Sequence, residues 1–327
     1  MKEPVLTVTA NSALDRCILV EDFAFGKTVV ARRSALAMAG KPADMSLVLA
    51  ELGVPSHATG LAGGRTGKVM VRMLERAGVS TSFLWVAGRT RVNVVIVKEG
   101  TGLQGTVTVP SLRPTEADGE ALARHVQELL PGRRWLLLGG SLPEGVRPDL
   151  YQRLIEAAHA SGVQTLLDAG GKTLQAALPA RPSVVKPNQV ELGLALGREL
   201  RSLPETIEAA RELIDQGVGT VVVTLGGEGA ICLNAAEGWY VPPLRVPVVN
   251  TAGAGDAFAA GLVKGFLAGE PLSGALRWAA AAATAVLLTL RTAHCRRRDV
   301  LRLLPQVQVL PLSQALSAQG ALQGTGA

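Results

Sequence analysis

A short glycine-rich run carries the residues best suited to chemistry in this chain. The run Asn250-Thr251-Ala252-Gly253-Ala254-Gly255-Asp256 follows an apolar, β-branched stretch at 246–249 and opens onto a helical pattern at 257–267. A glycine-rich turn at the start of a helix leaves backbone N–H groups unpaired, and together with the positive end of the helix dipole they can bind an anion. A tight turn with a solvated aspartate would use the same glycines. The stronger interpretation is phosphoryl transfer to a hydroxyl, with Asp256 as the base and Gly253, Ala254 and Gly255 supplying amides.

The elements that must position this run form a regular alternation. Short β-branched runs at 5–9, 135–138, 164–167, 183–186 and 220–224 alternate with helical patterns such as 116–130, 147–160 and 204–216. This alternation predicts an α/β fold with a mostly parallel central sheet covered by helices on both faces. Ligands of such sheets bind at the carboxyl ends of the strands. We therefore expect the polar motifs that follow the predicted strands to converge on one crevice.

Two segments interrupt the alternation. Residues 16–37 and 89–110 alternate apolar and polar side chains in the manner of β-hairpins, with turns near 25–27 and 99–102. Inserted into the chain at about 13–37 and 89–110, their four short strands would form a small separate flap. We expect one α/β domain over 1–310 and a poorly ordered tail over 311–327, whose last residues are small and polar.

The composition limits the classes of function. The 327 residues are 48% hydrophobic and 18% charged, with a formal net charge of +6, which is ordinary for a globular protein. The single tight basic run, 296–298, does not indicate a nucleic-acid site. Three widely spaced cysteines predict neither a disulfide framework nor a metal site. The chain starts without a signal-peptide pattern, and its longest apolar run, 278–290, is shorter than the ~20 residues that span a bilayer. We expect a buried, alanine-rich helix there and a cytoplasmic protein without membrane contact.

Five motifs in order resemble those of the ribokinase-like (PfkB) sugar kinases, and they span roughly the first 290 residues. They are Asn11-Ser12-Ala13-Leu14-Asp15, Gly139-Gly140-Ser141-Leu142-Pro143-Glu144-Gly145, Lys186-Pro187-Asn188-Gln189-Val190-Glu191, Thr224-Leu225-Gly226-Gly227-Glu228-Gly229-Ala230 and the run at 250–256. The pattern is most similar to the 1-phosphofructokinase and tagatose-6-phosphate kinase branch. The resemblance implies a three-layer ribokinase-like fold, with the flap as a β-sheet lid over the sugar site. It also implies ATP and Mg²⁺ as cofactors and a homodimer contact through the lid.

The resemblance assigns further roles residue by residue. Asp15 would orient the acceptor by accepting hydrogen bonds from two hydroxyls, and Lys27 and Arg91 would bind a sugar phosphate. The remaining substrate-binding residues are Gly40, Lys41, Asp44 and Ser141. The nucleotide-binding residues are Lys186, Asn188, Thr224, Gly226, Gly229 and Asn250. Asn188 and Glu191 would hold hydrated Mg²⁺, mostly through water, although a helix cap formed by the same pair is compatible with that role.

One loop departs from the family pattern and leaves the acceptor open. The family's sugar-binding G-G-K-G-x-N reads Ala39-Gly40-Lys41-Pro42-Ala43-Asp44 here. Pro42 fixes φ and removes an N–H, and Asp44 replaces an amide with a carboxyl group. Arg291 stands where relatives often have glycine. The sequence therefore predicts an ATP-dependent kinase of a sugar phosphate, of the fructose 1-phosphate, fructose 6-phosphate or tagatose 6-phosphate type. The alternatives are a kinase of an unphosphorylated sugar or nucleoside, and a catalytically silent sugar- or nucleotide-sensing protein.

Overall fold

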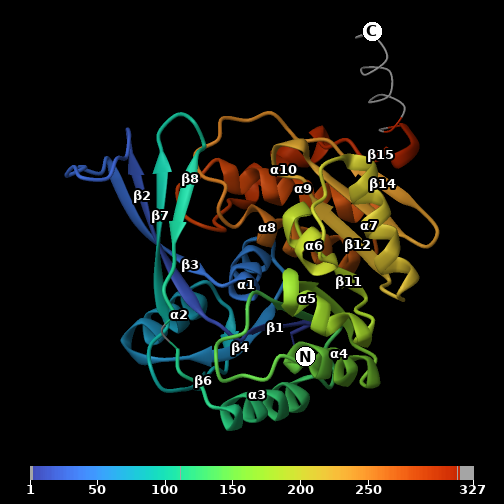
Figure 1. Cartoon of the computed structure of the whole chain (residues 1–327), viewed down its shortest axis with the longest axis horizontal. Coiled ribbons are helices and arrows are strands. Elements are labelled where there is room, and N and C mark those ends of the chain that lie inside the picture. The colour runs from blue at the N-terminus through green and yellow to red at the C-terminus, as the bar shows by residue number, and fades with distance from the viewer. Residues whose placement is uncertain (1–2, 111, 315, 317–327) are drawn as a thin grey trace.

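The chain is built around one large sheet, which is seen in a computed structural model that describes residues 3–110, 112–314 and 316. The strands of this sheet are β1 (Val5–Thr9), β4 (Ser56–Ala62), β5 (Ser80–Thr81), β6 (Leu84–Trp85), β9 (Trp135–Gly139), β10 (Gln164–Asp168), β11 (Val184–Val185), β12 (Thr220–Thr224), β13 (Ala230–Asn234), β14 (Gly238–Val241) and β15 (Leu310–Pro311). Their order is β15-β14-β13-β12-β11-β10-β9-β1-β4-β5, and β6 also pairs with β4 (Figure 1). The pairs from β5 to β12 are parallel. The pairs from β12 to β15 are antiparallel.

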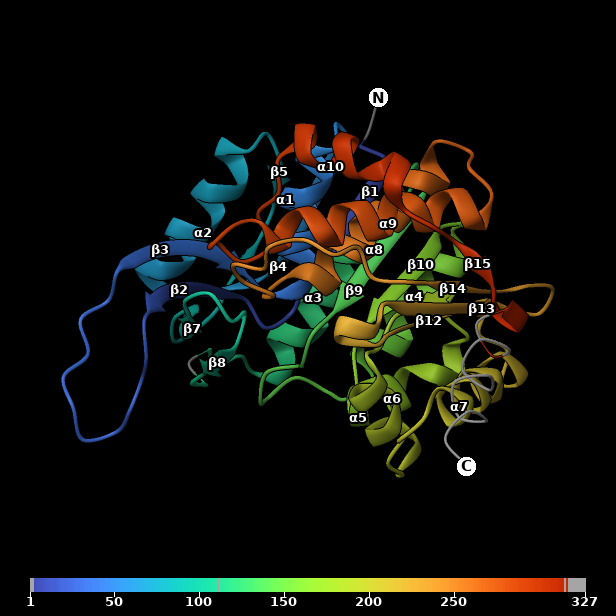
Figure 2. The same ribbon diagram turned by 90° about the horizontal axis from the view of Figure 1, so that it is seen from above.

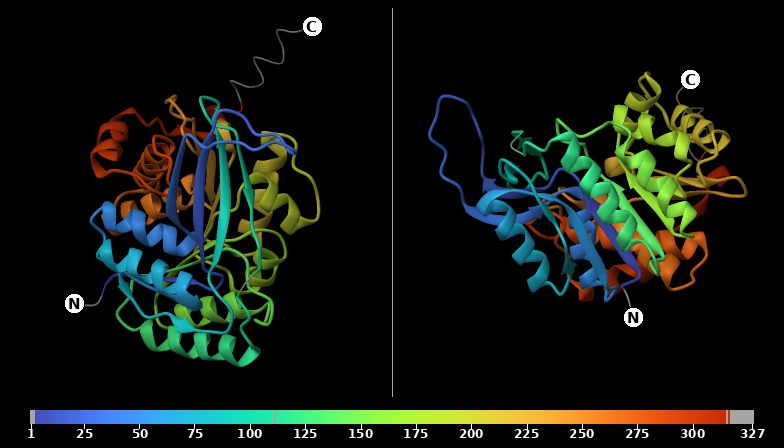
Figure 3. Two further views of the ribbon diagram at one scale, coloured as in Figure 1. Left: turned by 90° about the vertical axis from the view of Figure 1, so that its left-hand side faces the viewer. Right: turned by 90° about the horizontal axis from the view of Figure 1, so that it is seen from below.

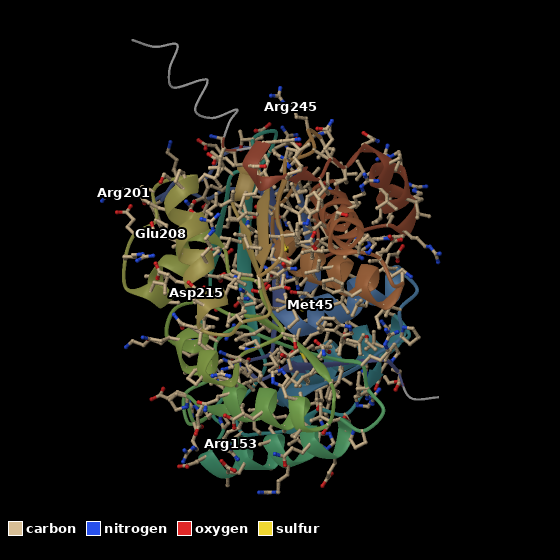
Figure 4. The ribbon with its side chains drawn as sticks, turned by 90° about the vertical axis from the view of Figure 1, so that its right-hand side faces the viewer. Met45, Arg153, Arg201, Glu208, Asp215 and Arg245 are labelled. Atoms are coloured by element: carbon tan, nitrogen blue, oxygen red, sulfur yellow. The ribbon has the colours of Figure 1, made fainter. Side chains whose placement is uncertain are left out.

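Helices cover both faces of this sheet. They are α1 (Lys41–Glu51), α2 (Gly64–Arg76), α3 (Glu116–Leu129), α4 (Leu150–Ala160), α5 (Gly171–Ala177), α6 (Gln189–Leu196), α7 (Leu203–Asp215), α8 (Ala254–Leu267), α9 (Leu272–Leu287) and α10 (Arg297–Leu303). Helices α3 to α7 pack on one face, while α1, α8, α9 and α10 pack on the other (Figure 2). Met45 of α1 lies in the interior, whereas Arg153 and Arg201 lie at the outer surface (Figure 4).

The strand sequences explain the two apolar layers. Successive side chains of a strand point to opposite faces, so a strand that is covered on both faces must be apolar throughout. In β1, Leu6 and Val8 join the layer of α3 to α7, whereas Val5 joins the layer of α8 and α9. In β9, Leu136 packs in the first layer and Leu137 in the second. The predicted α/β fold is confirmed.

A second, smaller sheet stands to one side of the molecule (Figure 3). It consists of β2 (Ala13–Val20), β3 (Arg33–Ala39), β7 (Arg91–Lys98) and β8 (Gln104–Val107), in the order β3-β2-β7-β8. Each predicted hairpin is present, and the two hairpins join through a parallel pairing of β2 with β7. We call this sheet the lid. The β2–β3 connection, residues 21–32, projects away from the rest of the chain (Figure 2).

The β-branched stretch 246–249 before α8 pairs with no described strand, and the Val249 N–H donates to the Leu287 carbonyl. One expected boundary differs from the observed structure, at the end of the chain. The expected tail starts at 311, yet Pro311 pairs in β15 and Leu312 is buried. Residues 315 and 317–327 of that tail lie outside the described residues. The alanine-rich helix is present as α9, and no described helix has the length and apolar character needed to cross a membrane.

Candidate active site

The motifs converge where the carboxyl ends of β10, β11 and β12 meet the start of α8 (Figure 1). Asp168 ends β10, and Lys186 follows β11 directly. Thr224 ends β12 and forms a bridge with Asn188, the N-cap of α6. Because these strands are parallel, their carboxyl ends lie at one edge of the sheet. The predicted crevice therefore receives its polar residues from three neighbouring strand ends.

The glycine-rich run forms an anion cradle at the first turn of α8. The Ala252 N–H donates to Asn250 Oδ1 at 3.0 Å, and the Ala254 N–H donates to the Thr251 carbonyl at 3.2 Å. Among the described residues the N–H groups of Gly253, Gly255 and Asp256 have no hydrogen-bond partner. Three free amides at the positive end of a helix can bind a phosphoryl group. The amide of Ala254, which the sequence analysis predicts as part of the cradle, shapes the loop instead, as does that of Ala252.

Gly253 shows why this loop requires glycine. Its φ is +80°, a conformation that L side chains rarely adopt, and a Cβ there would lie 2.3 Å from the Ala293 backbone nitrogen. Ala293 in turn donates its N–H to the Ala252 carbonyl at 3.1 Å. The cradle is thus pressed against the segment that follows α9.

Asp256 is buried beside the cradle amides, in the first turn of α8. Burial, and next the nearby charge of Asp168, raise the pKa of Asp256 to about 8, while the ammonium groups of Lys41 and Lys186 oppose the rise. A carboxyl whose pKa lies near the working pH can accept a proton and release it again.

Asp168, which the sequence analysis did not assign, anchors two lysines in the site. Lys41 Nζ lies 2.7 Å from Asp168 Oδ1 and 2.9 Å from Glu191 Oε1, and Lys186 Nζ lies 2.8 Å from Asp168 Oδ2. Burial alone would raise the pKa of Asp168, but the charges of Lys186 and Lys41 outweigh it and hold the pKa below its usual value. A Cβ on Gly255 would lie 3.3 Å from Lys186 Nζ, so this ammonium group also borders the cradle.

Asn188 and Glu191 cap α6 reciprocally. Asn188 Oδ1 accepts the Glu191 N–H at 2.8 Å, and Glu191 Oε2 accepts the Asn188 N–H at 2.9 Å. Gly170 permits this arrangement, because a Cβ there would lie 2.4 Å from the Glu191 side chain. Among the described residues no group of three His, Cys, Asp or Glu side chains has metal-binding geometry. The oxygen donors of Asn188, Glu191 and Asp168 are the kind that Mg²⁺ accepts, directly or through water.

On the lid side of the candidate site lies a buried carboxylate, Asp15, with two hydrogen-bond partners. Asp15 Oδ1 accepts from Asn93 Nδ2 at 2.8 Å, and Asp15 Oδ2 accepts from Thr292 Oγ1 at 2.7 Å. Burial raises the pKa of Asp15, and these two hydrogen bonds and the charge of Arg91 oppose the rise. Arg91 lies nearby with a buried Nε that has no hydrogen-bond partner among the described residues. Asn93 and Thr292 were not predicted as site residues.

The loop that differs from the family pattern, residues 39–44, leads into α1 and forms its first turn. Gly40 is its N-cap with φ +99°, and Pro42 lies in the first turn. A proline there loses no helical hydrogen bond, since the first N–H groups of a helix are unpaired in any case. Asp44 is 2% exposed, and its Oδ1 has no hydrogen-bond partner among the described residues. Burial, and next the charges of Asp256 and Asp15, raise the pKa of Asp44 well above its usual value.

Some of the predicted site residues lie farther from Asp256 and the cradle, or have a structural role. Lys27 lies on the exposed, projecting connection 21–32 of the lid. Ser141 Oγ accepts from Asn11 Nδ2 at 3.1 Å at the exposed rim. Asn250 is fully buried, and its Nδ2 donates to the Leu290 carbonyl at 2.7 Å, so its side chain shapes the cradle. Gly226 and Gly229 both have positive φ in the connection between the antiparallel strands β12 and β13.

The fold and the site together define an α/β phosphotransferase with a ribokinase-like architecture. Residues 7–298 match the pfkB family of carbohydrate kinases, and the chain belongs to this family. It is 32% identical over 318 residues to 1-phosphofructokinase of Vibrio cholerae serotype O1, covering 97% of this chain and 100% of the relative. Identity to 1-phosphofructokinase of Escherichia coli K12 is 30% over 316 residues, with 96% and 100% covered.

Solved structures give the same family and fold. Phosphofructokinase-2 from Escherichia coli in complex with potassium superposes with a TM-score of 0.85 at 28% identity, covering 93% of this chain and 99% of that chain. A possible 1-phosphofructokinase from Thermotoga maritima gives a TM-score of 0.87 at 26% identity, covering 94% and 99%. Ribokinase of Arabidopsis thaliana, at 23% identity and a TM-score of 0.74, shares the fold.

Proposed function

We propose that this protein is an ATP-dependent kinase that phosphorylates a hydroxyl group of a sugar phosphate, with Asp256 as the general base. One observation carries the proposal: Asp256 lies buried beside the free N–H groups of Gly253 and Gly255 at the start of α8. A base and an anion cradle in contact are what attack of a hydroxyl on a phosphoryl group requires. Relatives named 1-phosphofructokinase, and the structure of Escherichia coli phosphofructokinase-2 in complex with fructose-6-phosphate, support a sugar phosphate as the acceptor.

The surrounding residues divide into a nucleotide side and an acceptor side. Lys186 borders the cradle and would neutralise phosphate charge, while the β12–β13 connection at Gly226 and Gly229 would approach the nucleotide. Asp15 would accept hydrogen bonds from the acceptor, and Arg91 would pair with its phosphate.

Mg²⁺ fits the oxygen donors at the edge of this site. Asn188 and Glu191 would hold it, mostly through water, and Asp168 adds a third oxygen-bearing side chain nearby. When bound, the ion supplies positive charge for the phosphate groups of ATP. Lys41 keeps Glu191 and Asp168 close together, because its ammonium group bonds to both.

The test combines an acceptor panel with a base variant. ADP release is measured with sugar phosphates, unphosphorylated sugars and nucleosides, and a sugar phosphate should give the highest kcat/KM. Asp256→Asn should retain ATP binding and lower kcat by roughly 10²- to 10⁴-fold, because it removes the base. Asp215→Asn, on the outer surface of α7, is the control and should have wild-type turnover (Figure 4). Since the pKa of Asp256 is about 8, kcat/KM should rise with pH towards that value.

Each alternative has its own outcome in this experiment. Near-normal turnover of Asp256→Asn removes the base assignment. A nucleoside or free sugar as the preferred acceptor replaces the sugar phosphate, and the buried Asp44 beside Asp256 is the observation that favours this second candidate. ATP binding with no ADP release from any acceptor indicates a sensing protein.

We further propose that the lid joins two copies of the chain. Its projecting connection exposes Phe25 by 94% and Val30 by 85%, and Phe23 stacks edge-on against Phe25. Strand β8 adds exposed Val107 on the same small sheet. Exposed apolar side chains gathered on one element mark protein contacts. A tetrameric form is known for Escherichia coli phosphofructokinase-2, which supports self-association through some face of this fold.

A further inference from the structure

A cavity of about 670 Å³ lies beside the active site without sharing its predicted residues. Its walls come from Arg33 at the start of β3 and from the segment 288–299, which follows α9 and enters α10. Val249, next to the cradle, forms part of the floor. The base Asp256, the nucleotide-side Lys186 and the acceptor-side Asp15 do not line it.

Positive charge dominates this cavity. Four arginines line it, and the single carboxylate in its wall, Asp299, lies 3.2 Å from Arg302. In the described part of the chain no carboxylate forms an ion pair with any of the four, which are Arg33, Arg291, Arg296 and Arg298. Guanidinium groups bind phosphate through paired, charge-assisted hydrogen bonds. Unneutralised guanidinium groups around one cavity therefore favour an anionic ligand.

His294 supplies a second feature that points to a ligand. His294 lines the same cavity, and its buried Nδ1 has no hydrogen-bond partner among the described residues. A ligand that moves this side chain and reaches the nitrogen would supply the partner that it lacks, and so recover the free energy that an unpaired buried polar atom costs. The volume lies within the roughly 300–1,000 Å³ range of small-molecule sites.

The cavity wall is hydrogen-bonded to the cradle. The Val249 N–H donates to the Leu287 carbonyl at 2.7 Å. Asn250 Nδ2 donates to the Leu290 carbonyl at 2.7 Å, next to Arg291. Thr292, two residues before His294, donates to Asp15 at 2.7 Å. A ligand that holds the segment 288–294 in place acts on both ends of the active site through these bonds.

We propose that this cavity binds a small polyanion that carries phosphate groups, and that the bound anion regulates the kinase through the segment 288–294. The phosphate groups pair with the guanidinium groups of Arg291, Arg296 and Arg298. Because the segment is bonded to the cradle, anion binding and ATP binding change each other's affinity by the same factor. The proposed binding of the anion does not depend on which acceptor the enzyme phosphorylates.

Calorimetry with inorganic pyrophosphate tests the binding. The full chain is titrated while a saturating non-hydrolysable ATP analogue occupies the catalytic site. The double variant Arg296→Ala/Arg298→Ala should bind pyrophosphate about tenfold or more weakly than the wild type. The control Arg201→Ala/Arg245→Ala removes the same charge from exposed arginines elsewhere and should bind as the wild type does (Figure 4).

Kinetics test the regulation, and further ligands identify the source of the phosphate groups. Saturating pyrophosphate should shift the KM for ATP at least twofold in the wild type and in the control, but not in the cavity variant. Parallel titrations with inorganic phosphate, ADP and a sugar bisphosphate distinguish a free anion, a nucleotide and a sugar as the ligand. The binding site is refuted if pyrophosphate fails to bind, binds both variants equally, or is displaced by the ATP analogue. Binding without a change in KM refutes the regulatory role.

Discussion

Asp44 is buried within the electrostatic influence of two other carboxyl groups, those of Asp256 and Asp15. Neighbouring carboxylates in a low-dielectric space disfavour one another's ionisation, and burial acts in the same direction. A protonated carboxyl group donates one hydrogen bond and accepts others, as the amide of asparagine does. We infer that Asp44 replaces the family asparagine in its protonated form, in which the carboxyl group can both donate and accept hydrogen bonds.

This interpretation predicts how stability depends on pH. The pKa of Asp44 in the folded state lies above its ordinary value of 3.8, so the folded protein holds a proton that the unfolded chain has released. Its contribution to stability is therefore lost as pH rises from the unfolded pKa through the folded pKa. Asp44→Asn removes this dependence. The free energy of unfolding of the variant minus that of the wild type should increase as pH rises above the ordinary value of 3.8, measured by urea unfolding. A difference that is constant or that decreases with pH contradicts the inference.

At the scale of elements, most of the site was predictable because it follows strand ends. Alternating strand and helix patterns placed the end of β12 correctly and that of β11 to within one residue, and the order of motifs suggested Lys186 and Thr224. Asp168 ends β10, one residue beyond the strand predicted at 164–167. In the sequence, a single aspartate after a strand looks the same whether it caps a helix or belongs to a site, so Asp168 was not assigned. Its role depends on two lysines that are 127 residues and 18 residues away along the chain.

Other elements escaped prediction for physical reasons. Helix α1 has Gly40 as its N-cap, without a side-chain cap, and is buried on most of its surface, so no polar face distinguishes it. The stretch 246–249 has the composition of a strand, but composition does not provide a neighbouring strand to pair with. Asn93 and Thr292 act through Asp15, and their contacts arise only when the lid and the segment after α9 come together.

The contact between the cradle and the segment after α9 gives a prediction at this scale. Gly253→Ala introduces a Cβ 2.3 Å from the Ala293 nitrogen, so the cradle must move. Gly269→Ala is a matched control, because Gly269 also has a positive φ, +78°, but has nothing within 4 Å of a Cβ. The control should lose about 1 kcal/mol of stability and keep its turnover. Gly253→Ala should lose more stability and at least about tenfold in kcat, since its amides leave the reacting phosphoryl group. If Gly253→Ala and Gly269→Ala have equal effects on thermal unfolding and on turnover, the close contact between Gly253 and Ala293 has no role.

At the scale of the whole molecule, the lid is notable because some of its apolar side chains stay exposed to solvent in a single chain. It covers one side of the candidate site through Asp15 and Arg91, yet its connection 21–32 projects away from the body (Figures 2 and 3) and carries the exposed side chains of Phe23 and Phe25. Its inner face packs on the segment after α9, where Cys17 and Leu290 share a small apolar cluster. A second copy that covers the outer face would remove apolar surface from water.

The oligomeric state tests the proposed lid contact. Phe25→Asp places a charge at the most exposed apolar position of the connection and should convert a dimer into monomers, measured by light scattering after size exclusion. Leu194→Asp changes an equally apolar side chain, 67% exposed on α6, and should leave the dimer intact. A wild-type monomer, or a dimer that both variants preserve, excludes the lid as the interface.

The parallel pairing of β2 with β7 also sets the order in which the molecule can fold. Asp15 and its partner Asn93 are 78 residues apart, and all of α1, β4 and α2 lies between them. Pairings between distant residues form late, because the intervening chain must first be ordered to bring them together. Each hairpin can form locally, but the lid as one sheet cannot exist until β7 has been synthesised and docked. We therefore expect the lid sheet to form only after β7 has been synthesised, and Asp15 to gain its second partner, Thr292, only when the segment after α9 is in place.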